Sequence, residues 1–391
     1  MQTALKSNIW KYAVFLIANK RVFAAILGAY YISIPNVGAR EVGIILLAGS
    51  VAGFILEIPS GYISDKIGHK QALVFSRVCA TLSTVFFLFA NDLNYLILGG
   101  VFLSFASAFL SGTGAAFMHE TLRGLKREDD YAEVMGKIRS IGFAIPAVIA
   151  MAVPFLVAYS FKLPFLVGLI FDVIGLLVAA SFVAPNVTQE HIDEVNATNF
   201  IDVLKEGKKL KFIRIVLFTG LLAGLTAVAG RYRAVYWSFN DIPVMYYGVF
   251  LGIGRAFVSL LLLYSGKLKK VLSYNTYLAL RSLLFFALTV SLGFITSLWA
   301  IVVVFVVMNV ITFGFGSLSS SYKLDIIGKS KFKATLLSLG PQVSVLVIGM
   351  GGYLLGASID LWGYQTSFVL LAVCMLVSLL PLYLYLLKRN V

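Results

Sequence analysis

The chain contains 391 residues, of which 60% are hydrophobic and only 13% are charged, and its mean hydropathy is +0.92. Soluble domains carry about 25% charged residues, so this composition excludes an ordinary soluble fold and indicates a protein surrounded by lipid. The formal net charge is +14. The two cysteines, Cys79 and Cys374, lie far apart within apolar runs, which favours buried packing residues over a disulfide or a metal site.

Long apolar segments follow one another along almost the whole chain. A transmembrane helix needs about 20 mostly apolar residues, and the hydrophilic segment 185–212 separates two groups of such helices. We therefore predict an all-α membrane protein with twelve transmembrane helices in two six-helix halves, 1–184 and 213–391, joined by a linker at 185–212. The predicted spans are 10–34, 42–64, 70–90, 93–118, 137–159, 163–184, 213–238, 246–265, 271–293, 297–318, 335–358 and 363–387.

Basic residues are distributed very unequally between the two ends of these spans. With both termini in the cytoplasm, nearly all loop lysines and arginines fall on the cytoplasmic side, and the opposite side keeps only Arg40 and Lys162. This asymmetry is what the positive-inside rule describes. The charge of +14 is thus a topology signal that suits an anionic inner leaflet, and we expect no nucleic-acid partner.

One face of the second span and the loop after it carry a regular pattern. Because residues four apart share a helix face, small and acidic residues form one stripe there, which allows a neighbouring helix to approach closely. Gly68 permits a turn after this helix, and Lys66 and Lys70 favour the cytoplasmic side. The stripe consists of Gly49, Gly53, Glu57, Gly61 and Asp65.

The same loop resembles a known family signature. Gly61-x-x-x-Asp65-Lys66-x-Gly68-x-Lys70 is similar to the loop between helices two and three of major facilitator superfamily transporters. The resemblance implies the major facilitator fold and a role for Gly61, Asp65, Lys66, Gly68 and Lys70 as a conformational latch between the two halves. An ordinary, well-packed cytoplasmic turn is the alternative reading.

The residues before the latch point to one branch of this superfamily, and two other segments depart from the pattern of that branch. Glu57-Ile-Pro-Ser-Gly61 resembles a prokaryotic branch of efflux permeases, which implies the bacterial cytoplasmic membrane and favours export. Gly114-Ala115, however, stand where that branch has an acidic pair. The fifth span, with Pro146 and Pro154, also lacks the glycine-rich signature of drug/proton antiporters. Both departures argue against the prediction of a multidrug exporter.

Cations inside the predicted membrane are the main functional signal. A charge in mid-span is costly unless it faces a cavity or a partner. The acids in these spans that could neutralise the cations are Glu57 and Asp172. Each cation could instead form an internal ion pair or bond to a free carbonyl, and the roles of Asp172 and Arg281 stay open. The excess of cations over acids within the spans predicts an electropositive cavity that binds an anion. The predicted cavity residues are Lys20, Arg21, Arg231, Arg255, Ser107 and Asn309.

Together these observations predict a monomeric secondary transporter that moves a small organic anion by alternating access. Glu57 is the predicted proton-coupling residue, and a proton-coupled antiporter working in export is favoured. A multidrug exporter of lipophilic compounds and a lipid flippase of the same fold are the alternatives. The sequence has no phosphate-binding Gly-rich loop, no histidine spacing for a metal and no clustered nucleophile, acid and base. We therefore expect no enzyme activity, no cofactor and no metal.

Overall fold

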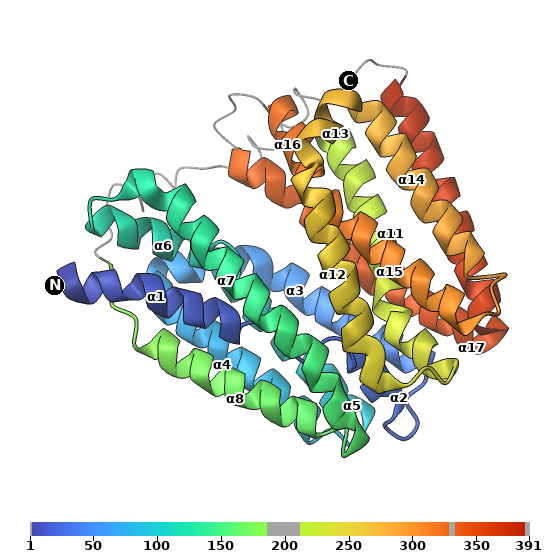
Figure 1. The fold of residues 1–391 in the computed structure, drawn as a ribbon, viewed down its shortest axis with the longest axis horizontal. Coiled ribbons are helices and arrows are strands. Elements are labelled where there is room, and N and C mark those ends of the chain that lie inside the picture. Colours follow the sequence, from blue (N-terminus) through green and yellow to red (C-terminus); the bar gives the residue numbers. More distant parts are fainter. Residues whose placement is uncertain (1, 186–211, 328–332, 388–391) are drawn as a thin grey trace. The chain divides into compact units, whose positions relative to one another are not determined.

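The computed structural model describes residues 2–185, 212–327 and 333–387, and within these ranges every regular element is a helix (Figure 1). Nine of these helices, some of them merged across short breaks, are long and apolar enough to cross a membrane. The prediction of an all-helical membrane protein is therefore confirmed. The number of spans, twelve, and the cytoplasmic termini stay predictions, and the proposed linker 185–212 lies almost entirely outside the described residues.

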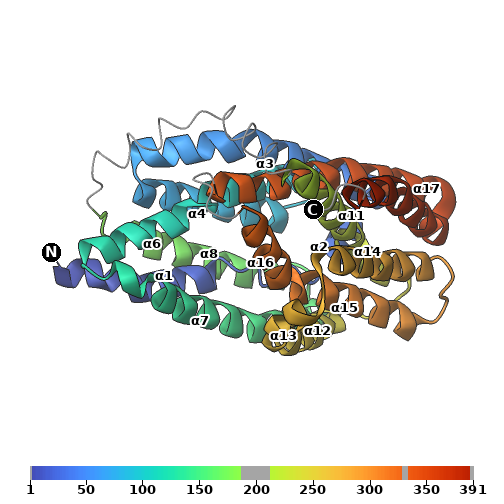
Figure 2. The ribbon, with the colours of Figure 1, turned by 90° about the horizontal axis from the view of Figure 1, so that it is seen from above.

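The chain forms two compact units, each described here by itself. Unit 1 comprises Met1–Asn36, Ala48–Ala197 and Val244–Gly248, and unit 2 comprises Val37–Leu47, Thr198–Pro243 and Val249–Val391. The helix α3 (Ala39–Ile67) begins in unit 2 and continues in unit 1. Both units are visible from two directions in Figures 1 and 2.

Unit 1 is built around α4, which packs against both α5 and α8, while α1 packs against α7 and α8. Aromatic side chains fill the space between α1, α6 and the end of α8: Tyr12, Phe15, Phe117 and Phe182 are buried and in ring contact. Its helices are α1 (Gln2–Ala18), α2 (Leu27–Ile32), α4 (His69–Leu88), α5 (Leu93–Leu110), α6 (Thr113–Gly124), η1 (Glu128–Asp130), α7 (Tyr131–Ala152), η2 (Val153–Ala158), α8 (Leu163–Ala180) and η3 (Val244–Tyr246).

Unit 2 is built around the packing of α11 against α17. The buried Tyr232 hydroxyl of α11 donates to the carbonyls of Gly352 (2.7 Å) and Ala39 (3.0 Å), which joins both helices to the start of α3. Gly363 has φ +76°, a value that favours glycine, and kinks α17 into two helical pieces. The helices are α11 (Phe212–Phe239), α12 (Tyr247–Leu263), α13 (Ser265–Val271), α14 (Tyr274–Ser291), α15 (Leu298–Gly314), α16 (Gly316–Ile327) and α17 (Lys333–Leu387).

Several predicted spans are interrupted. The prediction of one helix over 10–34 is wrong, because α1 ends at Ala18 and α2 begins only at Leu27. The predicted span 93–118 lies within one candidate membrane span, Leu93–Gly124, which is broken locally at Gly112, whose φ of +76° separates α5 from α6. A broken helix in a membrane needs other partners for its freed backbone groups. The interruption at residues 19–26 therefore points to polar side chains nearby.

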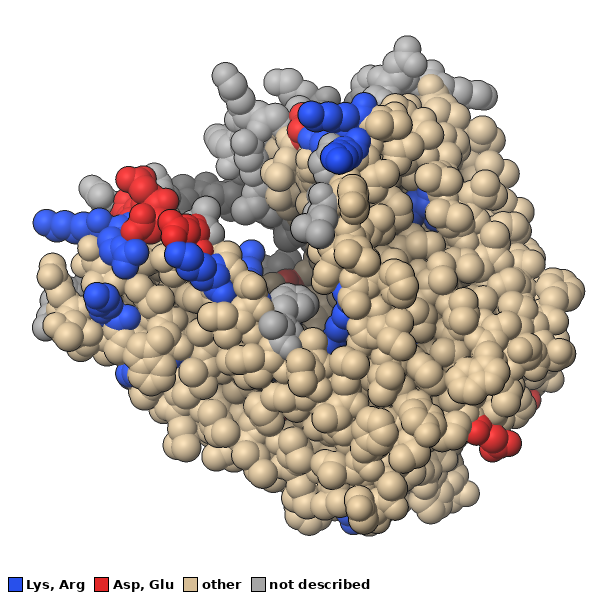
Figure 3. All heavy atoms as spheres, in the orientation of Figure 1, with Lys and Arg blue, Asp and Glu red and all other residues tan. Residues whose placement is uncertain are grey.

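Charged side chains gather at the ends of the helices and leave long apolar flanks. In Figure 3 one such group covers the region of α6, η1 and the beginning of α7, whereas the neighbouring surface is almost free of charged side chains. Three exposed ion pairs lie there: Arg123–Glu128, Arg127–Asp130 and Glu133–Lys137. This separation of charged ends from apolar flanks is what a bilayer requires.

Candidate functional site

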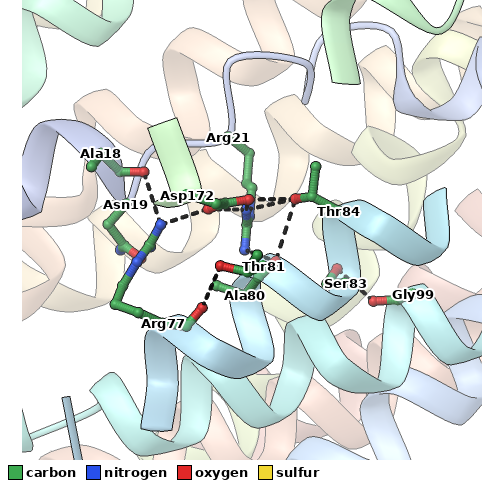
Figure 4. A network of polar contacts seen from close by, with 10 residues as sticks. All are labelled: Ala18, Asn19, Arg21, Arg77, Ala80, Thr81, Ser83, Thr84, Gly99 and Asp172. Atoms are coloured by element: carbon green, nitrogen blue, oxygen red, sulfur yellow. Dashed lines mark hydrogen bonds and ion pairs between the residues drawn. The ribbon is translucent and has the colours of Figure 1, made fainter. Parts of the chain in front are cut away.

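The interruption of the first span is held by a buried network of charged side chains (Figure 4). Asp172 of α8 is 1% exposed and accepts bonds from Arg21 (2.7 Å to Oδ2), Arg77 of α4 (2.5 Å to Oδ1) and Thr84 (2.5 Å to Oδ2). Each residue type suits its place, since a buried carboxylate survives only when paired and fully hydrogen-bonded. The network joins α4, α8 and the chain between α1 and α2.

Arg77 also replaces the hydrogen bonds that α1 loses at its end. Its Nη2 donates to the carbonyl of Ala18 (3.3 Å) and its Nη1 donates to Asn19 Oδ1 (2.9 Å). A guanidinium suits this place because free carbonyls at a helix C-terminus carry a partial negative charge. A Cβ at Gly175 of α8 would come within 2.7 Å of Arg77 Nε, so this glycine provides the space for the arginine.

The network contains two arginines and one carboxylate, and its members differ in exposure. The side chain of Arg77 is fully buried, whereas that of Arg21 is 15% exposed. Arg21 Nη2 lies 3.4 Å from the carbonyl of Ala80, and its Nη1 bonds Thr84 (3.1 Å) besides Asp172. The ion pair that the sequence left open for Arg21 and Asp172 is thus present. Lys20 is half-buried in the same interruption.

Sequence reasoning did not single out Arg77. The signal was available, because Arg77 is a lone cation within the apolar segment 70–90 and a charge at such a position asks for a partner. Its partner could not be chosen from the sequence, since Asp172 lies 95 residues away on a helix whose rotation the sequence does not determine.

The predicted cations of unit 2 lie in a different environment. Arg255 of α12 and Arg231 of α11 are exposed, and no carboxylate within 2–185, 212–327 or 333–387 forms an ion pair with either. Asn309 of α15 is half-buried, and its Oδ1 lies 3.6 Å from the Cβ position of Gly254, the neighbour of Arg255 in the chain. The structure thus brings Asn309 close to the backbone that carries Arg255.

Glu57 meets Ser111, and not the predicted Ser107, in unit 1. The carboxylate of Glu57 is half-buried and accepts a hydrogen bond from Ser111 (2.9 Å), which ends α5. It pairs with no cation among the described residues. The hydroxyl of Ser107 is turned to its own helix, where it donates to the carbonyl of Leu103 (2.9 Å).

The predicted latch is a tight turn between α3 and α4. Gly68, with φ +95°, precedes the first residue of α4, and Asp65 is half-buried. A Cβ at Gly61 would meet nothing within 4 Å, whereas at Gly49 it would lie 3.2 Å from Ser104. The close approach that the stripe predicts is therefore present at Gly49 and not at Gly61. Lys66 is exposed and Lys70 is half-buried.

A buried network of polar side chains lies beside the latch, and sequence reasoning did not predict it. His69 Nε2 lies 3.1 Å from Glu120 of α6, and His69 Nδ1 lies 2.9 Å from Ser64, which accepts a bond from Thr113 (3.0 Å). All four side chains are buried. This network fastens the latch turn to α6, and nothing in the spacing of these residues indicates that they meet.

Many apolar helices, with charges collected at helix ends and inside a broken span, define a polytopic membrane protein. The model of the Major Facilitator Superfamily matches residues 12–331. The chain therefore belongs to this superfamily and is a membrane transporter rather than an enzyme.

Relatives and solved structures agree with this assignment. An uncharacterized MFS-type transporter, YxaM of Bacillus subtilis (strain 168), is 23% identical over 382 residues, covering 93% of this chain and 91% of that protein. The nucleoside transporter NupG has a TM-score of 0.77 at 14% identity, covering 99% and 100% of the two chains. A bacterial homolog of the human lysosomal transporter Spinster has a TM-score of 0.74 at 12% identity, covering 98% and 96%. At such identities the structures share the fold alone.

Proposed function

We propose that this protein is a secondary transporter that moves a small organic anion across the bacterial cytoplasmic membrane by alternating access. The proposal includes twelve transmembrane helices, halves at 1–184 and 213–391, cytoplasmic termini and a monomeric protein. Proton-coupled export is the proposed direction. Superfamily members of known structure include transporters of nucleosides and of peptides, so the substrate class has to come from the residues of this chain.

The observation that supports the anion proposal is that Arg255 is exposed and has no carboxylate partner among the described residues. Arg255 lies in the middle of the apolar helix α12. An unpaired guanidinium is costly in hydrocarbon and is found where a membrane protein lines a water-filled cavity. A planar guanidinium binds carboxylate and phosphate groups through two parallel bonds. Asn309 adds a neutral polar group close by.

Arg21 takes a smaller part in this proposal than the sequence suggests. Its charge is held by Asp172, so its guanidinium is not available in full to a substrate. Arg231 is exposed and keeps its proposed role as a second contact for the anion. The positive charge offered to a substrate therefore comes mainly from unit 2.

Proton coupling is assigned to Glu57. A coupling carboxyl group has to change its protonation during the cycle, and Asp172 is already engaged in an internal ion pair with two arginines. Glu57 has a hydroxyl partner and no described cation. Of the two intramembrane acids that the sequence suggested for this role, Glu57 is therefore the one that is not engaged in an internal ion pair among the described residues.

The test is a thermal-shift screen of the purified protein against small organic anions, amphiphilic cations and lipids, since a ligand stabilises the state that it binds. Anions that stabilise the wild type should then be measured on Arg255→Gln, with Lys162→Gln, an exposed loop lysine, as the control of equal charge change. We expect the anion response to be lost only in Arg255→Gln. If only amphiphilic cations stabilise the protein, the anion proposal is wrong and multidrug export takes its place. If only lipids stabilise it, lipid transport takes its place.

A further inference from the structure

Unit 2 contains a second cationic cluster that the transport proposal does not use. Arg281 of α14 is only 8% exposed, and its Nη1 lies 3.1 Å from the hydroxyl of Tyr277. Lys323 of α16 is half-buried, and the residue before it, Tyr322, packs against Tyr277, one turn before Arg281 on α14. No carboxylate among the described residues pairs with either side chain.

Three tyrosines connect the two helices that carry these cations. The ring centroid of Tyr322 lies 5.2 Å from that of Tyr274 and 5.5 Å from that of Tyr277. On α14, Tyr274, Tyr277 and Arg281 follow at intervals of three and four residues and therefore share one helix face. Lys323 directly follows Tyr322. The cluster is thus fixed by aromatic packing between α14 and α16.

Several polar atoms of this cluster are buried without a partner. Arg281 Nε and the hydroxyl of Tyr274 are buried and have no hydrogen-bond partner among the described residues. A buried donor without an acceptor destabilises the fold, and more so when the group is charged. Buried groups of this kind call for a missing ion, water or ligand. Every unsatisfied group here can donate, and two groups are cationic, so the missing partner is an acceptor with negative charge.

We infer that Arg281, Lys323 and Tyr274 form a binding site for a phosphate group, separate from the proposed substrate contacts at Arg255. A guanidinium offers its paired donors to two oxygens, and an ammonium group and a hydroxyl supply further donors. A phosphate group has the several oxygens and the charge that this set requires. A lipid headgroup or a free phosphate can supply it.

The neighbouring helix α13 fits a lipid source. It carries Lys267, Lys269 and Lys270 within seven residues, and it packs against α16. Lys267 lies 5.5 Å from the ring of Tyr264, an exposed aromatic residue. Basic and aromatic side chains of this kind gather at the interface of a bilayer that contains anionic lipids. Lys269 is already paired with Asp325.

The experiment measures the melting temperature of the purified full-length protein in two arms. In the first arm sodium phosphate is titrated against sodium chloride at equal ionic strength. In the second arm the protein is placed in nanodiscs of phosphatidylglycerol or of phosphatidylcholine. The variants are Arg281→Gln and Lys323→Gln. Lys162→Gln is the control of equal charge change, because it removes an exposed loop lysine outside α13, α14 and α16.

We expect phosphate or phosphatidylglycerol to raise the melting temperature of the wild type by several degrees. The apparent affinity should fall at least about ten-fold in Arg281→Gln and Lys323→Gln, as the loss of a charge-assisted bond implies. The apparent affinity should stay within about two-fold in Lys162→Gln. A response in the lipid arm alone assigns the site to a headgroup, and a response to phosphate in solution assigns it to a free anion.

The inference is overturned when neither arm stabilises the wild type beyond its control, or when Lys162→Gln loses as much apparent affinity as Arg281→Gln. If Arg281→Gln does not fold, Lys323→Gln decides the outcome alone. The readout is binding, so failure here leaves the proposed transport of an anion at Arg255 untouched, and failure at Arg255 leaves this site untouched.

Discussion

Two groups of cations in this protein differ in whether a carboxylate pairs with them. In unit 1, Arg21 and Arg77 meet Asp172, and the carboxylate is bonded by both arginines and by Thr84. In unit 2, Arg281 and Lys323 lie near each other without a described carboxylate. The first arrangement uses charge to hold a broken helix. The second leaves charge unsatisfied, and such charge is available to a ligand.

The difference shows that an intramembrane arginine has no function by virtue of its position alone. Arg21 and Arg255 look alike in the sequence, each in an apolar span with small neighbours. In the structure one is an ion-pair member and the other is exposed and unpaired within the described chain. The presence of a carboxylate within reach, rather than the position along an apolar helix, distinguishes Arg21 from Arg255.

Neutralising the shared carboxylate should have the largest effect. Asp172→Asn leaves two arginines without a counter-charge, and breaking a buried pair costs about 3–5 kcal/mol. We expect a large fall in melting temperature or a loss of folded protein in size-exclusion chromatography. Asp325→Asn is the control, since its pair with Lys269 is exposed and should contribute no more than about 1 kcal/mol. Equal melting temperatures for the two variants would contradict the structural role of the network.

The same neutralisation at Glu57 should leave stability intact and remove coupling. In Glu57→Gln the amide can still accept the bond from Ser111, so the melting temperature should stay near that of the wild type. Uphill transport in proteoliposomes should be abolished, while exchange of substrate across the membrane persists, because exchange needs no net proton movement. Normal gradient-driven accumulation by this variant would remove Glu57 from the coupling role.

Arg255→Gln and Arg21→Gln should separate binding from stability. A charge-assisted bond contributes about 1.5–3 kcal/mol, so Arg255→Gln should weaken anion binding about ten- to hundred-fold with little change in melting temperature. Arg255→Lys should recover only part, since it lacks the planar fork. Arg21→Gln should instead lower the melting temperature, because Asp172 loses a partner. An unchanged affinity with a lower melting temperature in Arg255→Gln would refute the anion site there.

The smallest effect is expected at the latch. Asp65→Asn should slow transport and leave substrate affinity within a few-fold, because a residue that only biases two states does not touch the substrate. Transport rates and equilibrium binding measured on the same preparation check this. A large loss of affinity with a normal transport rate would show that Asp65 belongs to a binding site.

The helical membrane fold, the latch turn and the unusual charges could be predicted from the sequence alone. The apolar segments are long enough to span a bilayer, and only helices satisfy their own backbone there, so the helical membrane fold follows from composition and spacing. The turn at Gly68 and the superfamily signature around Asp65 are local as well, because each involves residues a few positions apart. The unusual charges at Arg21, Glu57 and Arg255 are visible for the same reason.

The tertiary structure decided which of these charges are satisfied. Arg77 and Asp172 are 95 residues apart, and their pairing depends on the packing of α4 against α8 and on the space at Gly175. The break between Ala18 and Leu27 likewise depends on Arg77, a side chain from another helix that bonds the end of α1. Hydropathy averages over a span and does not record which face of a helix meets which neighbour. The division into paired and unpaired cations therefore appears only when the helices are packed.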